Sequence, residues 1–418
     1  MNAPAPASIR HSTREAWAGV ATVQFVCLLV FTVITVTARW HSAYIPIVLA
    51  LAGTFFGRER IRFPAPFWWG VALLAWAFIS AFVAMSPEVA FATLETRLKV
   101  MLIFLVILNA IRSEKQLWIY LLVFLGSFMI YPARGTLINY AHGITNAHRV
   151  YWNGIYDNPN DLAAMTILAA GVALSIATAA MQSKMVRRLT VGCAAILILI
   201  VLITESRAGF LGLVTGMALP LLRKMRRAAI AFYAIVALCA GLAVVPHGFW
   251  VRMSGLKDLS SISTIREADK SGSAEQRWQI QKTAFKIFID HPLLGVGLGC
   301  YPLANNKYRP DLGLRDAHDT YLRLAAELGL PGLLIWAALV VSVLKQVKRT
   351  LRGKSKLQSV EPIWLKYGLF GFLVAGIFGS YSDLTILYLV LGMMWSAATL
   401  VLREQNPESA MSRVARVP

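Results

Sequence analysis

The chain is poor in charge and in cysteine. Only 15% of its 418 residues are charged, against about 25% in a typical soluble chain. The four cysteines include no Cys-x-x-Cys pair, and Cys27, Cys193 and Cys239 lie within apolar runs. The scarcity and placement of the thiols argue against a disulfide framework and against a thiolate metal site.

Apolar residues take the place of charge. They make up 57% of the sequence, and the mean hydropathy is +0.60, whereas soluble domains have about 45–50% apolar residues. They fall in blocks of roughly twenty, the length that crosses a bilayer as a helix. The sequence therefore predicts an all-α integral membrane protein with about 12 transmembrane helices. The expected spans are 17–37, 42–57, 66–85, 90–111, 116–133, 159–181, 189–204, 208–222, 228–248, 319–344, 363–381 and 383–402.

The charge that is present is mostly positive. The net charge is +20 and the pI about 10.1, which in a soluble protein would indicate a nucleic-acid partner. Here the basic residues cluster in short turns that all fall on one side of the membrane if both termini are cytoplasmic. That is the positive-inside pattern, and it also predicts contact with anionic membrane lipids and no nucleic acid. The basic turns are 58–62, 112–115, 184–188, 223–227 and 345–356.

The same topology predicts the domain organisation. Long loops are usually functional, and an amphipathic stretch at 275–290, with Trp278, Phe285, Ile287 and Phe288 at helical spacing, predicts a helical cap on the bilayer surface or on the bundle. The first apolar run lacks a clear cleavage site, so we expect a retained helix. The expected parts are a cytoplasmic tail (1–16), spans one to nine (17–248) with a short outer loop (134–158), a large outer loop (249–318), spans ten to twelve (319–403) and a cytoplasmic tail (404–418).

Basic residues on the outer side depart from the positive-inside pattern. Arg207 lies in the short outer turn 204–209. It could be an interfacial arginine paired with Glu205, or an anion ligand beside a helix that Ser206 caps. Arg277 could belong to a solvated helix face or bind a phosphate through its planar fork.

Two further places carry polar chemistry. His318 immediately precedes the tenth span, where it could pack at the interface or act as a general base near neutral pH. Arg97 and Lys99 lie within the fourth span, where charge is expensive and usually functional, although Glu95 could supply a local ion pair. The segment 157–161 could bind a metal, but a helix start capped by Asn160 or Asp161 is the simpler interpretation.

Two segments resemble the bacterial O-antigen ligases. In the first, His318 is followed by Gly329 and then by Gly332, as in the signature of that family, although the family often has Asn, Ser or Gln where this chain has Asp319. In the second, the run from Arg277 to Gly299 is similar to the stretch that precedes this histidine. The turn around Arg207 also resembles an arginine-bearing turn of the family.

The resemblance implies a glycosyltransferase of lipopolysaccharide biosynthesis in the bacterial inner membrane, a helical GT-C-like bundle with a periplasmic cap. Such an enzyme moves a glycan from undecaprenyl pyrophosphate to a sugar hydroxyl of lipid A–core at the periplasmic face. It implies no metal or nucleotide cofactor, and we expect a monomer. The implied catalytic residues are His318 as general base, with Arg207 and Arg277 on the pyrophosphate, and direct attack would invert the anomeric carbon. Further candidates for binding pyrophosphate or lipid are Arg97, Lys99, Arg134, Arg149, Arg315, Trp278 and Tyr321.

Other functions stay open. An O-antigen polymerase or a protein O-oligosaccharyltransferase of the same superfamily shares these features, although polymerases tend to have two large outer loops and an arginine–glycine spacing that is missing here. A lipid-linked glycan transporter or flippase would need polar groups near the middle of spans. A purely structural membrane protein would leave Arg207, Arg277 and His318 together without a reason.

Overall fold

The fold is that of a computed structural model of the chain. It describes residues 22–37, 44–57, 60–146, 149–180, 182–218, 273–350, 357 and 359–405. These residues form helices joined by short turns, and the two short strands pair in one antiparallel hairpin. The prediction of an all-helical architecture is therefore confirmed for the described part of the chain.

Several helices have the length and composition of membrane spans. Five described segments are long and apolar enough to cross a bilayer, and four shorter apolar helices accompany them. The span count and the cytoplasmic position of both termini stay predictions, and the expected span 228–248 lies outside the described residues. The long segments are Glu114–Ala141, α8 (Pro159–Ala177), α9 (Lys184–Ile203), α17 (Thr320–Thr350) and α19 (Thr385–Gln405), and the shorter ones are α2 (Val23–Thr37), α3 (Tyr44–Phe55), α4 (Ala65–Ala81) and α18 (Pro362–Ala375) with its 3-10 turn η4 (Gly376–Phe378).

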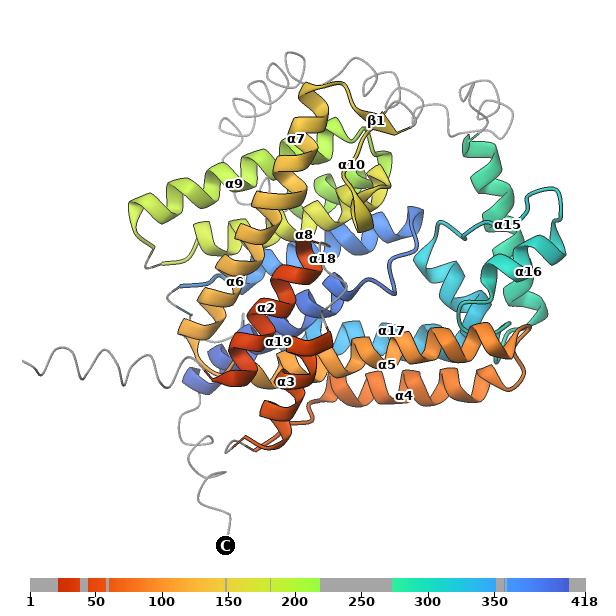
Figure 1. Ribbon diagram of the computed structural model, residues 1–418, viewed down its shortest axis with the longest axis horizontal. Coiled ribbons are helices and arrows are strands. Elements are labelled where there is room, and N and C mark those ends of the chain that lie inside the picture. The colour runs from red at the N-terminus through yellow and green to blue at the C-terminus, as the bar shows by residue number, and fades with distance from the viewer. Residues whose placement is uncertain are drawn as a thin grey trace, which may run out of the picture.

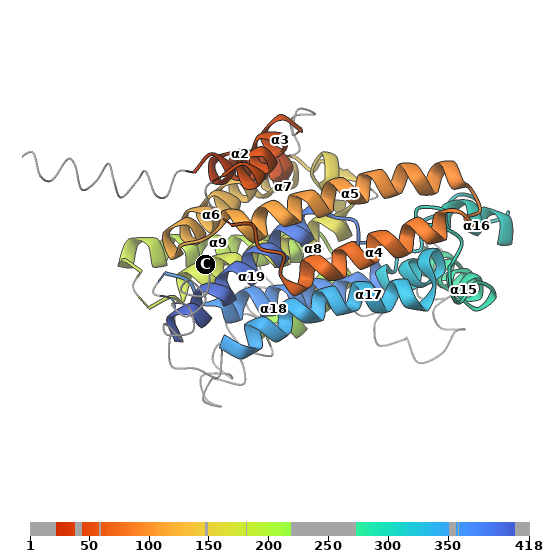
Figure 2. The ribbon, with the colours of Figure 1, turned by 90° about the horizontal axis from the view of Figure 1, so that it is seen from below.

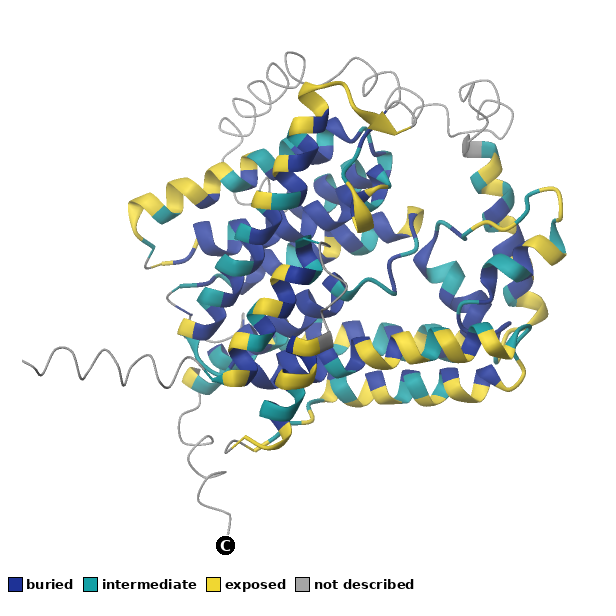
Figure 3. Ribbon diagram, in the orientation of Figure 1, coloured by how far each residue is buried: buried dark blue, intermediate teal, exposed yellow. Residues whose placement is uncertain are grey.

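Helix α8 forms the centre of the bundle. It is buried along nearly its whole length (Figure 3), because α9, α18 and α6 (Glu114–Phe128) pack around it. Helices α8 and α18 approach closely where Gly171 faces Gly368, and a Cβ on Gly171 would meet the Trp364 carbonyl oxygen at 2.9 Å. Small residues at a helix crossing allow this close packing between spans.

The helix of the fifth predicted span is longer than the sequence indicated. After α6 it passes through the π turn η1 (Met129–Ala133), which contains Pro132, and continues as α7 (Arg134–Ala141). A π turn accommodates a proline that a regular α-helix would exclude. The expected outer loop 134–158 therefore begins as helix. It goes on through β1 (Thr145–Asn146), β2 (Arg149–Val150) and the 3-10 turn η2 (Gly154–Tyr156).

A second, smaller core joins two helices to the end of the bundle. Helices α4, α5 (Pro87–Ala110) and α17 run side by side, and α15 (Ser273–Asp290) and α16 (Tyr301–Tyr308) lie across their far end (Figures 1 and 2). Ala81 and Ala90 from the bundle pack with Ile280, Ala284 and Ile287 of α15. The described residues 273–318 thus form the expected helical cap, and residues 249–272 lie outside them.

The amphipathic stretch is helical as predicted, but its packed face differs from the expected one. Ile280, Ala284 and Ile287 are buried, whereas Trp278 and Phe285 are 41% and 54% exposed. Counting back from these buried positions by the helical interval of three or four residues reaches residue 277. Arg277 therefore lies on the side of α15 that faces the rest of the protein.

Helix α17 is broken at Gly329, which has φ +69° and ψ −176°. The segment 292–297 fills the break. The backbone N–H groups of Val296 and Gly297 donate to the carbonyls of Ala326 and Glu327 at 2.9 Å, and the Leu330 N–H donates to the Pro292 carbonyl at 2.8 Å. These bonds satisfy groups that the broken helix leaves unpaired.

Candidate active site

His318 occupies a constrained position at the start of α17. Its φ is +48°, in the left-handed region that side chains other than glycine rarely adopt. The next residue fixes this turn, because the Asp319 carboxylate accepts hydrogen bonds from the backbone N–H groups of Tyr321 and Leu322 at 2.8 and 2.9 Å. Asp319 is thus the N-cap of α17. Asn and Ser are equally good N-caps, which explains how Asp319 can replace them after the histidine.

Thr320 ties the same turn to the segment before α19. Its hydroxyl donates to the Gly379 carbonyl at 2.6 Å and accepts from the Tyr381 backbone N–H at 2.9 Å. The segment 379–384 is therefore held against the residues that carry His318.

The charges around His318 favour its neutral form. Burial lowers the pKa of His318, and the neighbouring guanidinium of Arg277 lowers it further; Asp316 raises this pKa, and Arg315 lowers it. The predicted base and one predicted arginine are therefore brought together, although they belong to different helices. A neutral imidazole near pH 7 can accept a proton.

Hydrogen bonds made by Ser206 and Arg149 hold the turn that carries Arg207. Ser206 caps α10 (Arg207–Leu213), as predicted, by accepting from the Gly209 N–H at 3.1 Å. The Ser206 hydroxyl donates to Asn160 Oδ1 at 2.8 Å, and Arg149 donates to the same oxygen and to the Thr204 carbonyl, both at 2.9 Å. Arg149 is buried, and it fixes the position of this turn. After α10 the described stretch 182–218 ends with the π turn η3 (Val214–Ala218).

The start of α8 joins this turn to the histidine. Helix α8 begins at Pro159 with Asn158 as its N-cap, so the helix-start interpretation is confirmed, while the expected capping residues, Asn160 and Asp161, were wrong. Asp161 instead interacts with Asp316 and Tyr381. Residues from α8, α15, the start of α17 and the segment 379–384 therefore meet in one place.

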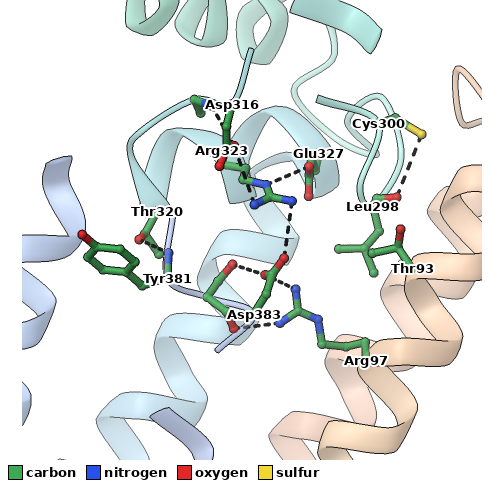
Figure 4. Close-up of polar contacts among 12 residues, drawn as sticks. Thr93, Arg97, Leu298, Cys300, Asp316, Thr320, Arg323, Glu327, Tyr381 and Asp383 are labelled. Carbon is green, nitrogen blue, oxygen red and sulfur yellow. Dashed lines mark hydrogen bonds and ion pairs between the residues drawn. The ribbon is translucent and has the colours of Figure 1, made fainter. Parts of the chain in front are cut away.

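A buried ion network lies beside this place (Figure 4). Arg97 is paired with Asp383 and donates to the Ser382 carbonyl at 2.7 Å. Arg323 lies 3.4 Å from Asp383, and it also reaches two further carboxylates. These are Glu327 at 3.0 Å and Asp316 at 3.6 Å. The network holds both segments that flank the site, since Asp316 comes shortly before His318 and Asp383 shortly after Tyr381.

Sequence reasoning missed most of this network. The spacing of Arg323 and Glu327, four residues apart, is a signal for a helical ion pair and could have been noticed. Asp383 could not have been assigned, because its partners come from two distant helices. Arg97 was predicted to bind substrate or lipid, and it binds Asp383.

The other candidates lie in different surroundings. Lys99 pairs with Glu95 at 2.6 Å on an exposed helix face, the local ion pair that the sequence allowed. Tyr321 donates to the Leu373 carbonyl at 2.7 Å and so points into the bundle. Arg134 is exposed and lines an apolar groove of about 350 Å³ between α7 and α9 that contains none of the other candidates. Trp278 is partly exposed, with Lys282 over its ring.

The arrangement suits an anionic substrate and a proton transfer. Arg277 and Arg315 lie near a histidine that is held neutral, and Arg149 fixes the neighbouring turn that begins with Arg207. The described residues include no group of three or more His, Cys, Asp or Glu side chains that could hold a metal ion.

Comparison with known proteins gives a family match for the part of the chain that contains these residues. No curated protein matches the chain. The family model for O-antigen ligases matches residues 192–337, the interval that contains the Arg207 turn, the Arg277 helix, His318 and the broken turn at Gly329. Over residues 192–337 the chain is therefore similar to the O-antigen ligase family.

Proposed function

We propose that the protein is an O-antigen ligase that transfers a glycan from undecaprenyl pyrophosphate to a sugar hydroxyl of lipid A–core at the periplasmic face of the inner membrane. The observation that carries the proposal is that Arg277 lies close enough to His318 for its charge to lower the pKa of the histidine, inside the segment matched by the family. One group can bind an anion and the other can take a proton, which are the two requirements of this transfer.

His318 is the general base in the proposed reaction. The acceptor hydroxyl loses its proton to the imidazole as its oxygen attacks the anomeric carbon of the donor glycan. The bond from that carbon to the pyrophosphate oxygen breaks, and undecaprenyl pyrophosphate leaves with the electron pair. Attack on the face opposite the leaving group inverts the anomeric carbon.

The arginines stabilise the leaving group. Cationic groups aimed at developing negative charge lower the barrier in a site that excludes water, and guanidinium binds phosphate oxygens in pairs. Arg277 and Arg207 bind the pyrophosphate in this proposal, and Arg149 keeps the Arg207 turn in place. Arg315 adds positive charge on the exposed side.

The proposal is tested by glycan transfer with the purified protein in EDTA. Undecaprenyl-diphosphate-linked glycan is the donor and lipid A–core the acceptor, and wild type is compared with His318→Ala and with His142→Ala. We expect product from the wild type, a loss of about 100-fold or more in His318→Ala, and normal transfer in His142→Ala. The control histidine lies at the exposed end of α7, where its ring bonds to the Ile138 carbonyl.

Other products would lead to other assignments. Longer glycans on the lipid carrier, with none on lipid A–core, would identify a polymerase. Transfer to a protein acceptor alone would identify a protein O-oligosaccharyltransferase. Normal transfer by His318→Ala would remove this histidine from the mechanism, and the absence of any transfer by the wild type would overturn the proposal.

A further inference from the structure

The hydroxyl of Tyr381 stands out among the buried tyrosines. Tyr381 is 1% exposed, yet its hydroxyl makes no hydrogen bond of regular geometry among the described residues, although the Asp161 carboxyl group lies close enough to interact with it. The fully buried Tyr156, Tyr301 and Tyr388 each donate to a backbone carbonyl, at 2.8, 3.0 and 3.1 Å, and Tyr120 accepts from Thr32 at 3.1 Å. Buried polar groups usually have a partner, and an exception calls for a ligand or another reason.

The position of Tyr381 offers a reason for its unusual hydroxyl, because the residue lies beside the candidate active site. Its backbone N–H is bonded to Thr320, two residues from His318, and its ring points away from the ion network around Asp383 (Figure 4). The side chain interacts with Asp161, and Arg277 is close enough for its charge to act on the hydroxyl. The Tyr381 hydroxyl is thus part of the candidate active site.

The carboxyl group of Asp161, next to the Tyr381 hydroxyl, restricts the kind of ligand that could bind there. Asp161 brings a carboxyl group into a place that also contains Asp316 and Arg277, and carboxyl groups do not attract a diphosphate. A carboxylate accepts hydrogen bonds and a neutral phenol donates one. Burial raises the pKa of Tyr381 well above its ordinary value, so its hydroxyl keeps the proton. A donor beside an acceptor matches a sugar hydroxyl, which both accepts and donates.

We propose that Tyr381 and Asp161 form a subsite that binds one sugar hydroxyl next to the reaction centre, with Tyr381 donating to it and Asp161 accepting from it. This subsite rests on the proposed transferase function. The hydroxyl belongs either to the sugar joined to the pyrophosphate or to the acceptor sugar, and kinetics separate the two.

The test measures transfer by Tyr381→Phe and Asp161→Asn with each substrate varied while the other is saturating. We expect Tyr381→Phe to lower kcat/KM by about 3- to 10-fold, the value of one neutral hydrogen bond. Asp161→Asn should lower it as well, because an amide at this position changes the hydrogen bond that the sugar hydroxyl makes with residue 161. A fall confined to the donor places the hydroxyl on the donor sugar, and a fall confined to the acceptor places it on the acceptor sugar. Unchanged kcat/KM for both substrates would overturn the subsite.

A second measurement separates this role from a structural one. Removing a hydroxyl that makes no regular hydrogen bond in the free protein should leave the thermal midpoint of Tyr381→Phe unchanged or slightly higher. Tyr388→Phe is the matched control, and its midpoint should fall because its hydroxyl is bonded to the Ser382 carbonyl. A fall in Tyr381→Phe as large as that in Tyr388→Phe would overturn the proposal.

The two proposals fail in different ways. If the wild type transfers no glycan, the proposed function is wrong. The subsite is then decided by the thermal comparison together with the affinities of wild type and Tyr381→Phe for the lipid-linked glycan and for lipid A–core. Equal affinities of the two proteins for both substrates would reject it.

Discussion

His318 combines a strained backbone with a pKa below the ordinary value for histidine, and its neighbours cause both features. Asp319 and Thr320 hold the turn, so the left-handed conformation is imposed by the capped helix that follows. Residues kept in such conformations often mark functional sites. The structure thus adds a physical reason to a role that the sequence alone inferred from the residue type and its place at a span boundary.

The flanking charges predict opposite shifts of the pH profile. Arg315 lowers the pKa of His318 and Asp316 raises it. The base is active when neutral, so the rate should fall as the pH drops through that pKa, which lies below about 6.5. Arg315→Gln should therefore move the acid limb of kcat/KM to higher pH, and Asp316→Asn should move it to lower pH. Profiles of the two variants that shift in the same direction would contradict this assignment.

The two charged residues of the fourth span should differ strongly in their effect on stability. Arg97 is 5% exposed and paired with Asp383, whereas the Lys99 side chain is 46% exposed. Removing one partner of a buried pair costs about 3–5 kcal/mol when the other charge is left unpaired; Arg323 still compensates Asp383 in part, so that range is an upper limit. Arg97→Met should therefore lower the thermal midpoint in detergent by many degrees, and Lys99→Met should hardly change it. Equal midpoints would show that the buried network contributes little.

At the scale of single residues the sequence identified candidate residues better than it identified their contacts. His318, Arg277 and the Ser206 cap were identified from residue type, spacing and resemblance. Asp383, Tyr381 and the site-facing role of Asp161 were missed, because each depends on contacts between segments far apart in the chain. Such contacts leave no periodic signal in a single sequence.

Among the elements, the broken helix α17 explains the glycine of the family signature. Its break at Gly329 receives the segment 292–297, and a Cβ at this position would meet the Leu293 carbonyl oxygen at 1.9 Å. Gly295 faces the same break, where a Cβ would meet the Glu327 carbonyl carbon at 2.3 Å. The glycines that accompany the histidine therefore serve packing between the cap and the bundle.

Two glycines with nearly the same φ differ in how crowded their surroundings are. Gly329 and Gly313 have φ of +69° and +70°, but a Cβ on Gly313 would meet nothing within 4 Å. Gly313→Ala should cost about 1–2 kcal/mol, the penalty for a side chain in the left-handed region. Gly329→Ala carries the clash in addition and should destabilise the protein much more. Thermal unfolding of both variants in detergent measures the difference, and equal losses would assign the whole effect to backbone strain.

Helix α15 shows where periodicity was insufficient. It has apolar side chains on two faces, and the sequence offers no means of choosing the one that packs. The larger side chains, Trp278 and Phe285, are exposed, while Ile280, Ala284 and Ile287 form the contact. Ala81 and Ala90 belong to the same cluster, and their small side chains allow α15 to pack closely against the bundle through this face.

For the whole molecule, apolar run length predicted the helical bundle well. Most span positions agree with described helices to within a few residues, since a run of apolar residues that crosses a bilayer must be helical. The lengthened α6–α7 segment was missed because its polar end, 134–141, is typical of a loop. How the helices pack around α8 depends on their shapes, and hydropathy does not encode it.

The orientation predicted from the basic turns can be tested by thiol labelling. In a variant without native cysteines, Asp311→Cys should react with a membrane-impermeant reagent in intact spheroplasts, because the cap is expected to face the periplasm. Lys184→Cys, in the turn between α8 and α9, should react only after permeabilisation. Both positions are exposed, so access depends on the side of the membrane, and the reverse pattern would invert the topology.

The break in α17 also has a consequence for how the family signature works. Residues 320–328 are continuous helix between the Asp319 cap and Gly329, so their number sets the angle between His318 and the segment that fills the break. One inserted residue would rotate His318 by about 100° about the helix axis, away from Arg277, without altering either end of the motif. The number of residues between histidine and glycine therefore sets the helical phase of the site, so its length constrains the geometry in the same way as the identity of the residues.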